Sequence, residues 1–191
     1  PERPSIEPSS GSVRPQARVF DDGSGPALYA GARWNLASNV AKWNGTSWSP
    51  VGSVVHPVIA AFEAFDDGSG PALYAGGSGS FSIPVLRKWD GASWTTIAGV
   101  NAGGLPHVDA LQAYDDGSGP ALYVGGSFRG AGGQPIPVLA QWRNNTWSKV
   151  GSGMNAESEI DRVNALALGA DGSLYSGGQH QLVGGKRVEH L

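Results

Sequence analysis

The sequence predicts an all-β fold made of repeated units that stack against one another. The first observation is a near-identical motif that occurs four times, as DDGSGPALYAG, DDGSGPALYAGG, DDGSGPALYVGG and, in a shorter form, DGSLYSGG. The second is its period, because the motif tyrosines are 45, 49 and 52 residues apart: Tyr29, Tyr74, Tyr123 and Tyr175. A repeat of this length is one supersecondary unit, which buries its apolar face only against neighbouring units.

The composition agrees with short strands joined by tight turns. The 191 residues include 30 Gly and 13 Pro without a collagen period, and 40% of them are hydrophobic, enough for a sizeable core. No stretch combines a 3.6-residue apolar period, capping residues and the length of a helix, because Gly or Pro interrupts nearly every stretch of about ten residues. We therefore expect strands and turns throughout.

The third repeat shows the expected elements most clearly. Its first segment alternates apolar and polar residues, as a half-buried strand does, and ends at an Asp-Asp-Gly-Ser-Gly-Pro turn. The second is a compact apolar run that closes on a Gly pair, and the third and fourth flank an Arg-Asn-Asn turn. The four expected strands are 107–114, 121–126, 137–142 and 146–150.

Four antiparallel strands per repeat are the layout of a β-propeller blade. We expect a single propeller domain, with a Pro/Ser-rich tail and then three blades and a partial fourth: 1–12, 13–52, 53–105, 106–155 and 156–191. About three and a half blades do not close a ring, and open strand edges attract other chains. We therefore expect further residues of the polypeptide, or another chain, to complete the ring.

Specific residues make the repeat similar to a known family. LYVGG is followed, after a variable stretch, by VLAQWRNNTWSKV, and three repeats carry two Trp at an interval of five residues: Trp43/Trp48, Trp89/Trp94 and Trp142/Trp147. This pattern resembles the kelch motif of kelch-type β-propellers, and it is similar to the Gly/Trp-rich repeat propellers of secreted bacterial proteins. The resemblance covers about residues 13–191 and implies four-stranded blades. The DDGSG turn, and the first Trp of each pair where kelch repeats usually have Tyr, depart from the kelch pattern.

Charge and composition argue against several classes of protein. The net charge of −3 arises from 13 basic and 16 acidic residues without a basic cluster, which makes a nucleic-acid surface a poor expectation. No apolar run approaches the roughly 20 residues that span a bilayer, so we expect no membrane insertion. There is no Cys for disulfides or thiolate metal sites. The resemblance to secreted repeat proteins implies a secreted or cell-surface location.

The repeats separate two faces of the expected propeller. The turns that join the first strand to the second, and the third to the fourth, hardly change between repeats, and we call their side the repeat-turn face. The remaining connections differ in length and chemistry, and we call their side the variable face. Binding residues concentrate on variable loops held by a rigid scaffold, so we expect ligands on the variable face.

Seven residues of the variable face are candidate ligand contacts: Trp34, His56, Phe81, His107, Phe128, Arg129 and Arg162. The equivalent positions His56, His107 and Arg162 start the innermost strands, so they could converge on an anion, a carboxylate or, for the two His, a metal. Because no acidic third ligand accompanies the His pair, we expect no metal site, and the alternative is that these residues only begin a strand. The aromatic residues could stack on a sugar or anchor a protein, or Phe81 and Phe128 could pack beneath the loops.

The repeated Trp and Asp residues are expected to be structural. The six paired Trp occupy the same positions in successive repeats, so they should wedge between neighbouring sheets. Adjacent Asp residues open each turn, as in Asp66 and Asp67, and could bind calcium through their oxygens. They lack the alternating ligands of an EF-hand, however, and Asp commonly caps the backbone of its own turn. We therefore favour a turn over a calcium site.

Taken together, these features favour a non-catalytic module that presents variable loops to a protein or glycan ligand. A catalytic site needs a nucleophile or an acid/base pair among stabilising groups, and the sequence offers no such set, so we expect neither enzymatic activity nor a cofactor. The copper oxidases among kelch propellers use a Cys-modified Tyr, and this chain has no Cys. One alternative is a structural repeat protein that assembles with further copies through its open edges. Another is a part of a propeller hydrolase or lyase that acts on glycans.

Overall fold

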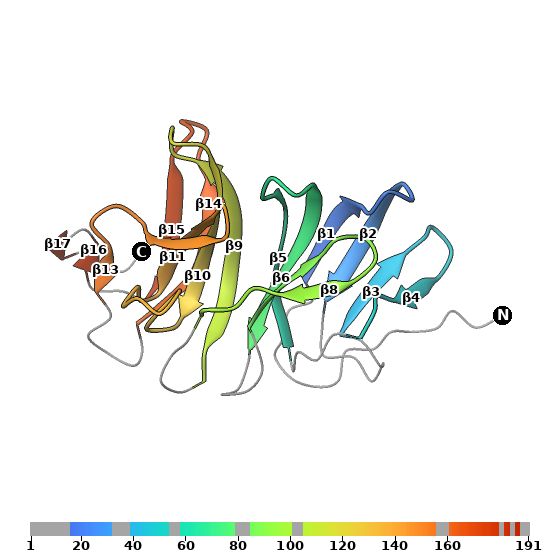
Figure 1. Ribbon diagram of the computed structural model, residues 1–191, viewed down its shortest axis with the longest axis horizontal. Helices are drawn as coiled ribbons and strands as arrows, with labels where there is room; N and C mark the ends of the chain where they lie inside the picture. Colours follow the sequence, from blue (N-terminus) through green and yellow to red (C-terminus); the bar gives the residue numbers. More distant parts are fainter. Residues whose placement is uncertain are drawn as a thin grey trace.

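The computed structural model describes residues 16–31, 39–53, 58–78, 85–100, 105–155, 161–179, 182–183 and 186–187. Every regular element in these ranges is a β-strand, and the strands pair antiparallel (Figure 1). The prediction of an all-β chain is confirmed for these residues. None of them belongs to a helix long and apolar enough to cross a membrane.

The first repeat folds into a four-stranded antiparallel sheet, which we call unit one. Its strands pair in consecutive order: β1 (Gln16–Asp21), β2 (Pro26–Gly31), β3 (Val40–Trp43) and β4 (Trp48–Pro50). The β1–β2 turn depends on its glycines, because Gly23 and Gly25 have φ values of 93° and 106°. The sequence motif is therefore a hairpin turn whose backbone only Gly adopts easily.

The second and third repeats form one curled, eight-stranded sheet. Its strands are β5 (Val58–Asp66), β6 (Pro71–Ser78), β7 (Leu86–Trp89), β8 (Trp94–Thr96), β9 (His107–Asp115), β10 (Pro120–Ser127), β11 (Leu139–Arg143) and β12 (Thr146–Lys149). Strands β5–β8 (unit two) and β9–β12 (unit three) each pair in consecutive order. One residue pair, Ser78 with His107, joins the two units.

The remaining strands belong to the fourth repeat and its connection. β14 (Arg162–Leu168) and β15 (Leu174–Gln179) form a two-stranded sheet, which we call unit four. β16 (Leu182–Val183) lies between β13 (Met154–Asn155) and β17 (Lys186–Arg187) in a three-stranded sheet.

The units share the same strand register. The motif tyrosine lies opposite Lys42 in unit one, Lys88 in unit two and Gln141 in unit three. In units one, two and three the two Trp face each other across the third and fourth strands, with ring centroids 5.4, 5.4 and 5.0 Å apart. The expected equivalence of the repeats is therefore confirmed at the level of individual residue pairs.

The Gly pair that ends each motif has a steric cause. A Cβ on the second glycine, at Gly77, Gly126 or Gly178, would collide with the carbonyl oxygen of the first residue of the adjacent strand. The strand register shifts at this point in units two, three and four. The first glycine lets the next unit approach, because a Cβ on Gly125 would lie 2.6 Å from the Val163 side chain.

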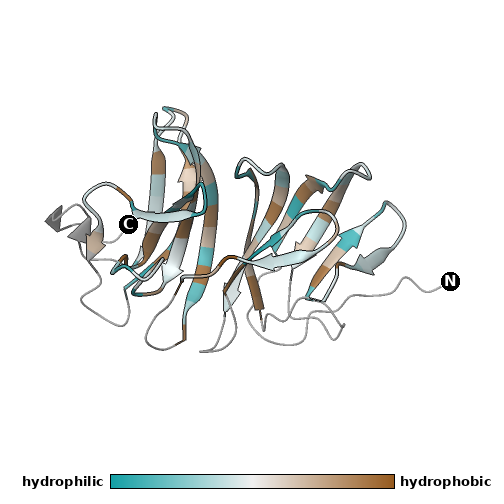
Figure 2. Cartoon of the chain, in the orientation of Figure 1, coloured by the Kyte–Doolittle hydropathy of each residue, from teal (hydrophilic) through white to brown (hydrophobic). Residues whose placement is uncertain are grey.

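The hydrophobic core lies between the units. One cluster joins Tyr29 and Val40 of unit one to Ile59 and Leu73 of unit two, and the largest cluster joins units two and three in the same way. A smaller cluster joins units three and four. Figure 2 shows the hydrophobic residues mainly within the strands, interleaved with hydrophilic ones. The prediction that stacked neighbours supply the core is confirmed.

The first strands of successive units are neighbours, since β1 contacts β5, β5 contacts β9 and β9 contacts β14. The β1–β2, β5–β6, β9–β10 and β14–β15 turns all point to the top of the view in Figure 1, which is the repeat-turn face. Only unit one is a separate four-stranded sheet, because units two and three share theirs.

The paired Trp residues connect the units, as expected. The Trp94 indole of unit two donates from Nε1 to the Val51 carbonyl of unit one at 2.9 Å. The Trp147 indole of unit three donates to the Ala98 carbonyl of unit two at 2.8 Å. Units two and three therefore each place an indole on the end of the preceding unit.

Candidate functional site

The variable face is described only in part. Three of its predicted contacts lie outside the described residues: Trp34, His56 and Phe81. The other four are described, and each has a different environment: His107, Phe128, Arg129 and Arg162.

Phe128 packs inside the molecule. Its side chain is 2% exposed, in the core between units two and three, together with Ala131 and Ile136 of the same loop. Of the two roles that the sequence left open, the structure gives Phe128 the packing role, because a ring with so little exposed surface cannot contact a ligand. Its burial instead anchors the loop that follows β10.

Arg129 is the second residue of the one long connection of the variable face that is described throughout, residues 128–138. Backbone hydrogen bonds hold this loop, since Val138 N donates to Phe128 O and Gly132 N donates 3.1 Å to Gly99 O of unit two. Arg129 itself is exposed, and its side chain takes part in none of the hydrogen bonds or ion pairs within the described residues. A fixed loop thus presents a guanidinium that is exposed and has no partner within the described part of the chain.

Arg162 is engaged with a carboxylate that sequence reasoning missed. Its Nε donates to Asp109 Oδ2 at 2.7 Å and its Nη2 to Asp109 Oδ1 at 2.5 Å. The hydrogen bonds to Asp109 raise the Arg162 pKa against the opposing effect of burial. This bidentate pair joins unit four to unit three. Unit two has Ala60 at the position equivalent to Asp109, so the repeats gave no signal for it.

His107 starts β9 half-buried, and its backbone makes the pair with Ser78 that joins units two and three. β9 and β14 are in contact, so His107 and Arg162 begin neighbouring strands as expected. The expected equivalence of His56 with His107 is wrong, because the strand register places Val58 at that position of unit two. Their predicted convergence on an anion is weakened by Asp109, which supplies the negative charge from within the protein.

A second polar series lies on the first strands, directly opposite the motif tyrosines: Arg18, Glu63 and Gln112. Arg18 Nη2 donates to Glu63 Oε1 at 3.0 Å, across units one and two. Glu63 is 4% exposed, and burial raises its pKa, although Arg18 and the Ala113 backbone N–H oppose the rise. The fixed offset from each Tyr could have revealed this series in the sequence.

The repeat-turn face is built from self-contained polar clusters. In unit two, Asp66 Oδ1 accepts hydrogen bonds from the Gly68 and Gly70 N–H groups. The Asp67 carboxylate accepts from Ser69, from the Tyr74 hydroxyl at 2.8 Å and from Lys88 Nζ at 2.7 Å. The same bonds occur in unit one. The prediction that these Asp residues cap their own turns is confirmed.

The cluster shifts the pKa of its members in opposite directions. Burial alone would raise the Asp67 pKa, but the hydrogen bonds from Lys88, Ser69 and Tyr74 outweigh it and hold that pKa well below its usual range. Burial and the hydrogen bond to Asp67 together raise the Tyr74 pKa. At neutral pH the carboxylate is therefore ionised and the phenol neutral, which suits a structural hydrogen bond.

In unit three the cluster is rearranged. Gln141 replaces the Lys, and Arg143 Nη2 reaches the Asp116 carboxylate at 3.2 Å instead. The Asp116 side chain is 40% exposed, against 10% for Asp22 and 7% for Asp67.

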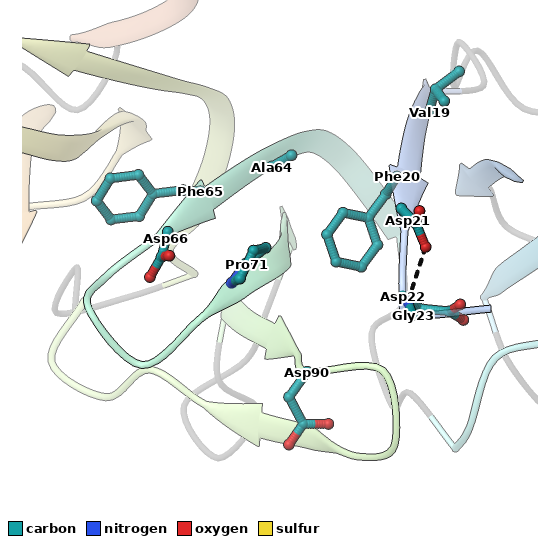
Figure 3. A pocket seen from close by; sticks show the side chains of 10 residues that line it. All are labelled: Val19, Phe20, Asp21, Asp22, Gly23, Ala64, Phe65, Asp66, Pro71 and Asp90. Carbon is teal, nitrogen blue, oxygen red and sulfur yellow. Dashed lines mark hydrogen bonds between the residues drawn. The ribbon is translucent and has the colours of Figure 1, made fainter. Parts of the chain in front are cut away.

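A hollow of about 710 Å³ opens on the repeat-turn face between units one and two (Figure 3). Its wall is apolar, with Phe20, Phe65 and Pro71, and its rim carries the Asp21, Asp66 and Asp90 carboxylates. Phe20 and Phe65 are each 7% exposed, and one oxygen of every rim carboxylate already caps a turn. The hollow can receive an apolar group, but its residues mainly serve the turns.

No group of three or more His, Cys, Asp or Glu side chains suited to a metal ion occurs within the described ranges. Comparison with known proteins finds no match for the chain among family models, curated proteins or solved structures.

Proposed function

We propose that the chain forms a β-propeller with four-stranded blades, in which units one, two and three are blades and unit four is part of another. The support is the common strand order and register, the neighbouring first strands and the cores placed between units. The resemblance of the Gly-pair and Trp-pair pattern to kelch repeats supports the same architecture. Further copies or further segments would close the ring.

We propose that this propeller is a non-catalytic binding module whose variable face recognises a protein or a glycan. The observation that carries the proposal is the loop 128–138, because it is fixed to the neighbouring unit and yet exposes the Arg129 guanidinium, which has no partner among the described residues. Arg is enriched among the residues that dominate protein interfaces, and it also donates several hydrogen bonds to hydroxyl or carboxylate groups of sugars.

The chemistry of the other described polar groups favours binding over catalysis. Carboxylates, phenols and amines that could act as acids or bases bond to one another in the turn clusters, as Asp67, Tyr74 and Lys88 do. The lowered pKa of Asp67 keeps its carboxylate ionised and the raised pKa of Tyr74 keeps its phenol neutral, so both remain in the protonation states of their mutual hydrogen bond. A secreted or cell-surface location remains part of the proposal and rests on the resemblance to secreted repeat proteins.

A paired experiment tests the binding face. The chain is applied to a glycan array and used to capture proteins, and each ligand found is titrated against Arg129→Ala and against Lys149→Ala. Lys149 is an exposed cation on β12 outside the loop. We expect Arg129→Ala to weaken binding about tenfold or more and Lys149→Ala to leave it unchanged. Full binding by a variant that combines Arg129→Ala, Trp34→Ala and Phe81→Ala would exclude the variable face.

A second candidate function is self-assembly, and the two ends of the unit series favour it. Leu28 of unit one is 36% exposed, whereas its counterparts Leu73 and Leu122 are fully buried against the preceding unit. Tyr175 of unit four is 56% exposed, whereas Tyr29 and Tyr74 are fully buried against the following unit. The two ends thus expose complementary halves of the interface that joins the units, and head-to-tail contact between copies would cover both.

A further inference from the structure

A hollow of about 490 Å³ lies between units three and four, in the size range of roughly 300–1,000 Å³ that ligand pockets occupy. Its wall is formed by Tyr123 and Leu139 of unit three, by the segment from Val150 to Met154, and by Leu174 and Ser176 of unit four. All these residues are described. The hollow is distinct from the variable-face loop of Arg129 and from the hollow between units one and two.

The same position is filled at the other two junctions. By register, Tyr123 and Leu139 correspond to Tyr29 and Val40 of unit one, and Val150 and Gly151 to Val51 and Gly52. Between units one and two, these residues are covered by Trp89 and Trp94. Between units two and three, the counterparts are covered by Trp142 and Trp147. The cluster between units three and four contains no Trp.

The glycine that follows the fourth strand shows the difference directly. Gly52 and Gly151 have the same φ of 57°. A Cβ on Gly52 would lie 2.9 Å from Cδ1 of Trp94 and 3.3 Å from Cζ3 of Trp89. A Cβ on Gly151 would meet nothing within 4 Å. The backbone is therefore shaped for an indole at both places, and only the first holds one.

We propose that this hollow is a docking site for a β-hairpin that carries two tryptophans five residues apart. The first Trp would pack on Tyr123 and Leu139, as Trp89 packs in the cluster of Tyr29 and Val40. The second would lie over Gly151 and donate its indole N–H to a backbone carbonyl of the Val150–Gly151 segment, as Trp94 donates to Val51. The neighbouring Asp116 side chain is 40% exposed and would become buried when the hairpin docks. Its counterparts Asp22 and Asp67, at the two junctions that hold a Trp pair, are only 10% and 7% exposed.

The test uses a hairpin whose sequence this chain supplies. A backbone-cyclised peptide of residues 139–150, LAQWRNNTWSKV, is titrated into the full chain by calorimetry, since cyclisation removes much of the ordering cost. We expect one peptide to bind per chain, and each Trp→Ala peptide to bind about thirtyfold more weakly or worse. Absence of binding by the parent peptide, or binding of either Ala peptide as tightly as the parent peptide, would overturn the proposal.

Matched protein variants locate the peptide. Ser152→Trp places a bulky side chain at an exposed position of the hollow, and Thr146→Trp places the same side chain at an exposed position of β12 outside it. We expect Ser152→Trp to lose binding and Thr146→Trp to retain it, with circular dichroism confirming that both are folded. Equal binding by Ser152→Trp and the parent chain would place the peptide elsewhere and refute the site. Arg129→Ala should leave peptide binding unchanged, which separates this site from the variable face.

Discussion

At the scale of single residues, two constraints explain why the motif has nearly the same sequence in each repeat. In units one to three, the glycines of the motif occupy backbone positions where a side chain would collide or where φ is positive. The Asp, Ser and Tyr side chains form hydrogen bonds with one another and with the turn backbone, so few polar groups of the turn depend on water for a hydrogen-bond partner. Both constraints act within one unit or between adjacent units, so the same residue types are required at equivalent positions of each unit.

The second glycine of each pair gives a sharp prediction. Gly126→Ala should destabilise the protein by about 3 kcal/mol or more, because its Cβ would strike the His107 carbonyl, which is backbone and cannot swing aside. Gly133→Ala is the control, since a Cβ there meets nothing within 4 Å and only its positive φ of 76° is costly. Urea unfolding measures both, and an equal loss in the two variants would contradict the steric reason for the Gly pair.

The turn cluster of unit two should make stability depend on pH. The pKa of Asp67 is lower in the folded state than in the unfolded state. The ionised carboxylate therefore contributes fully to the free energy of unfolding above the unfolded-state pKa near 4, and this contribution is lost as the pH falls toward the folded-state pKa. We expect Asp67→Asn to cost about 2 kcal/mol at pH 7 and clearly less at pH 3. Lys88→Gln, which copies the Gln141 of unit three, should cost less than Asp67→Asn at pH 7. An Asp67→Asn loss that is the same at both pH values would be inconsistent with the ionised cluster.

At the scale of elements, the unit is held by its neighbours more than by its own sheet. Its core side chains face adjacent units, and its second Trp bonds to the end of the preceding unit. Short strands such as β4 and β8, of three residues each, would not be stable on their own. Stability should therefore be shared along the series of units.

Trp147 tests this sharing. Trp147→Phe should cost about 1–2 kcal/mol, because it removes the hydrogen bond to the Ala98 carbonyl and the five-membered ring of the indole but keeps a six-membered aromatic ring. Trp147→Ala should cost about 3–5 kcal/mol, because the ring is 9% exposed and packs between units two and three. Denaturant unfolding gives both values, and hydrogen exchange should show that protection falls in unit two as well as unit three. Loss confined to unit three would show that the units do not share their core.

The elements were predictable because each repeat restates the same strands and turns. The expected segment 107–114 is β9 (His107–Asp115), and 121–126 is the centre of β10 (Pro120–Ser127). The role of the Trp pair was also predictable, since identical positions in successive units imply a shared interface. Residues that occur once could not be placed in this way: Asp109 meets Arg162 only because β9 and β14 lie together, and Phe128 is buried by the particular course of its loop.

At the scale of the whole molecule, the units form a series with two unlike ends. One end exposes Val19 and Leu28, and the other exposes Leu168 and Tyr175. Between them, the junction of units one and two buries Tyr29 and Leu73, and the junction of units two and three buries Tyr74 and Leu122. Contact between these two exposed apolar ends is the basis of the proposed self-assembly.

Mixing two variants tests whether the ends recognise each other. Leu28→Asp blocks one end and Tyr175→Asp the other, and both positions are exposed, so folding should be preserved. In light scattering we expect the parent chain to associate as its concentration rises and each variant alone to remain monomeric. An equimolar mixture should form one-to-one dimers, because each variant keeps the end that the other lacks. A mixture that stays monomeric would rule out head-to-tail contact.

A crystal structure of this chain tests most directly whether the repeats share their cores around a common axis. We predict that β1, β5, β9 and β14 follow one another about one axis, with the Trp94 indole on the Val51 carbonyl and the Trp147 indole on the Ala98 carbonyl. Sheets that bury their own tryptophans separately, or first strands that do not adjoin in this order, would contradict the shared core and the propeller together.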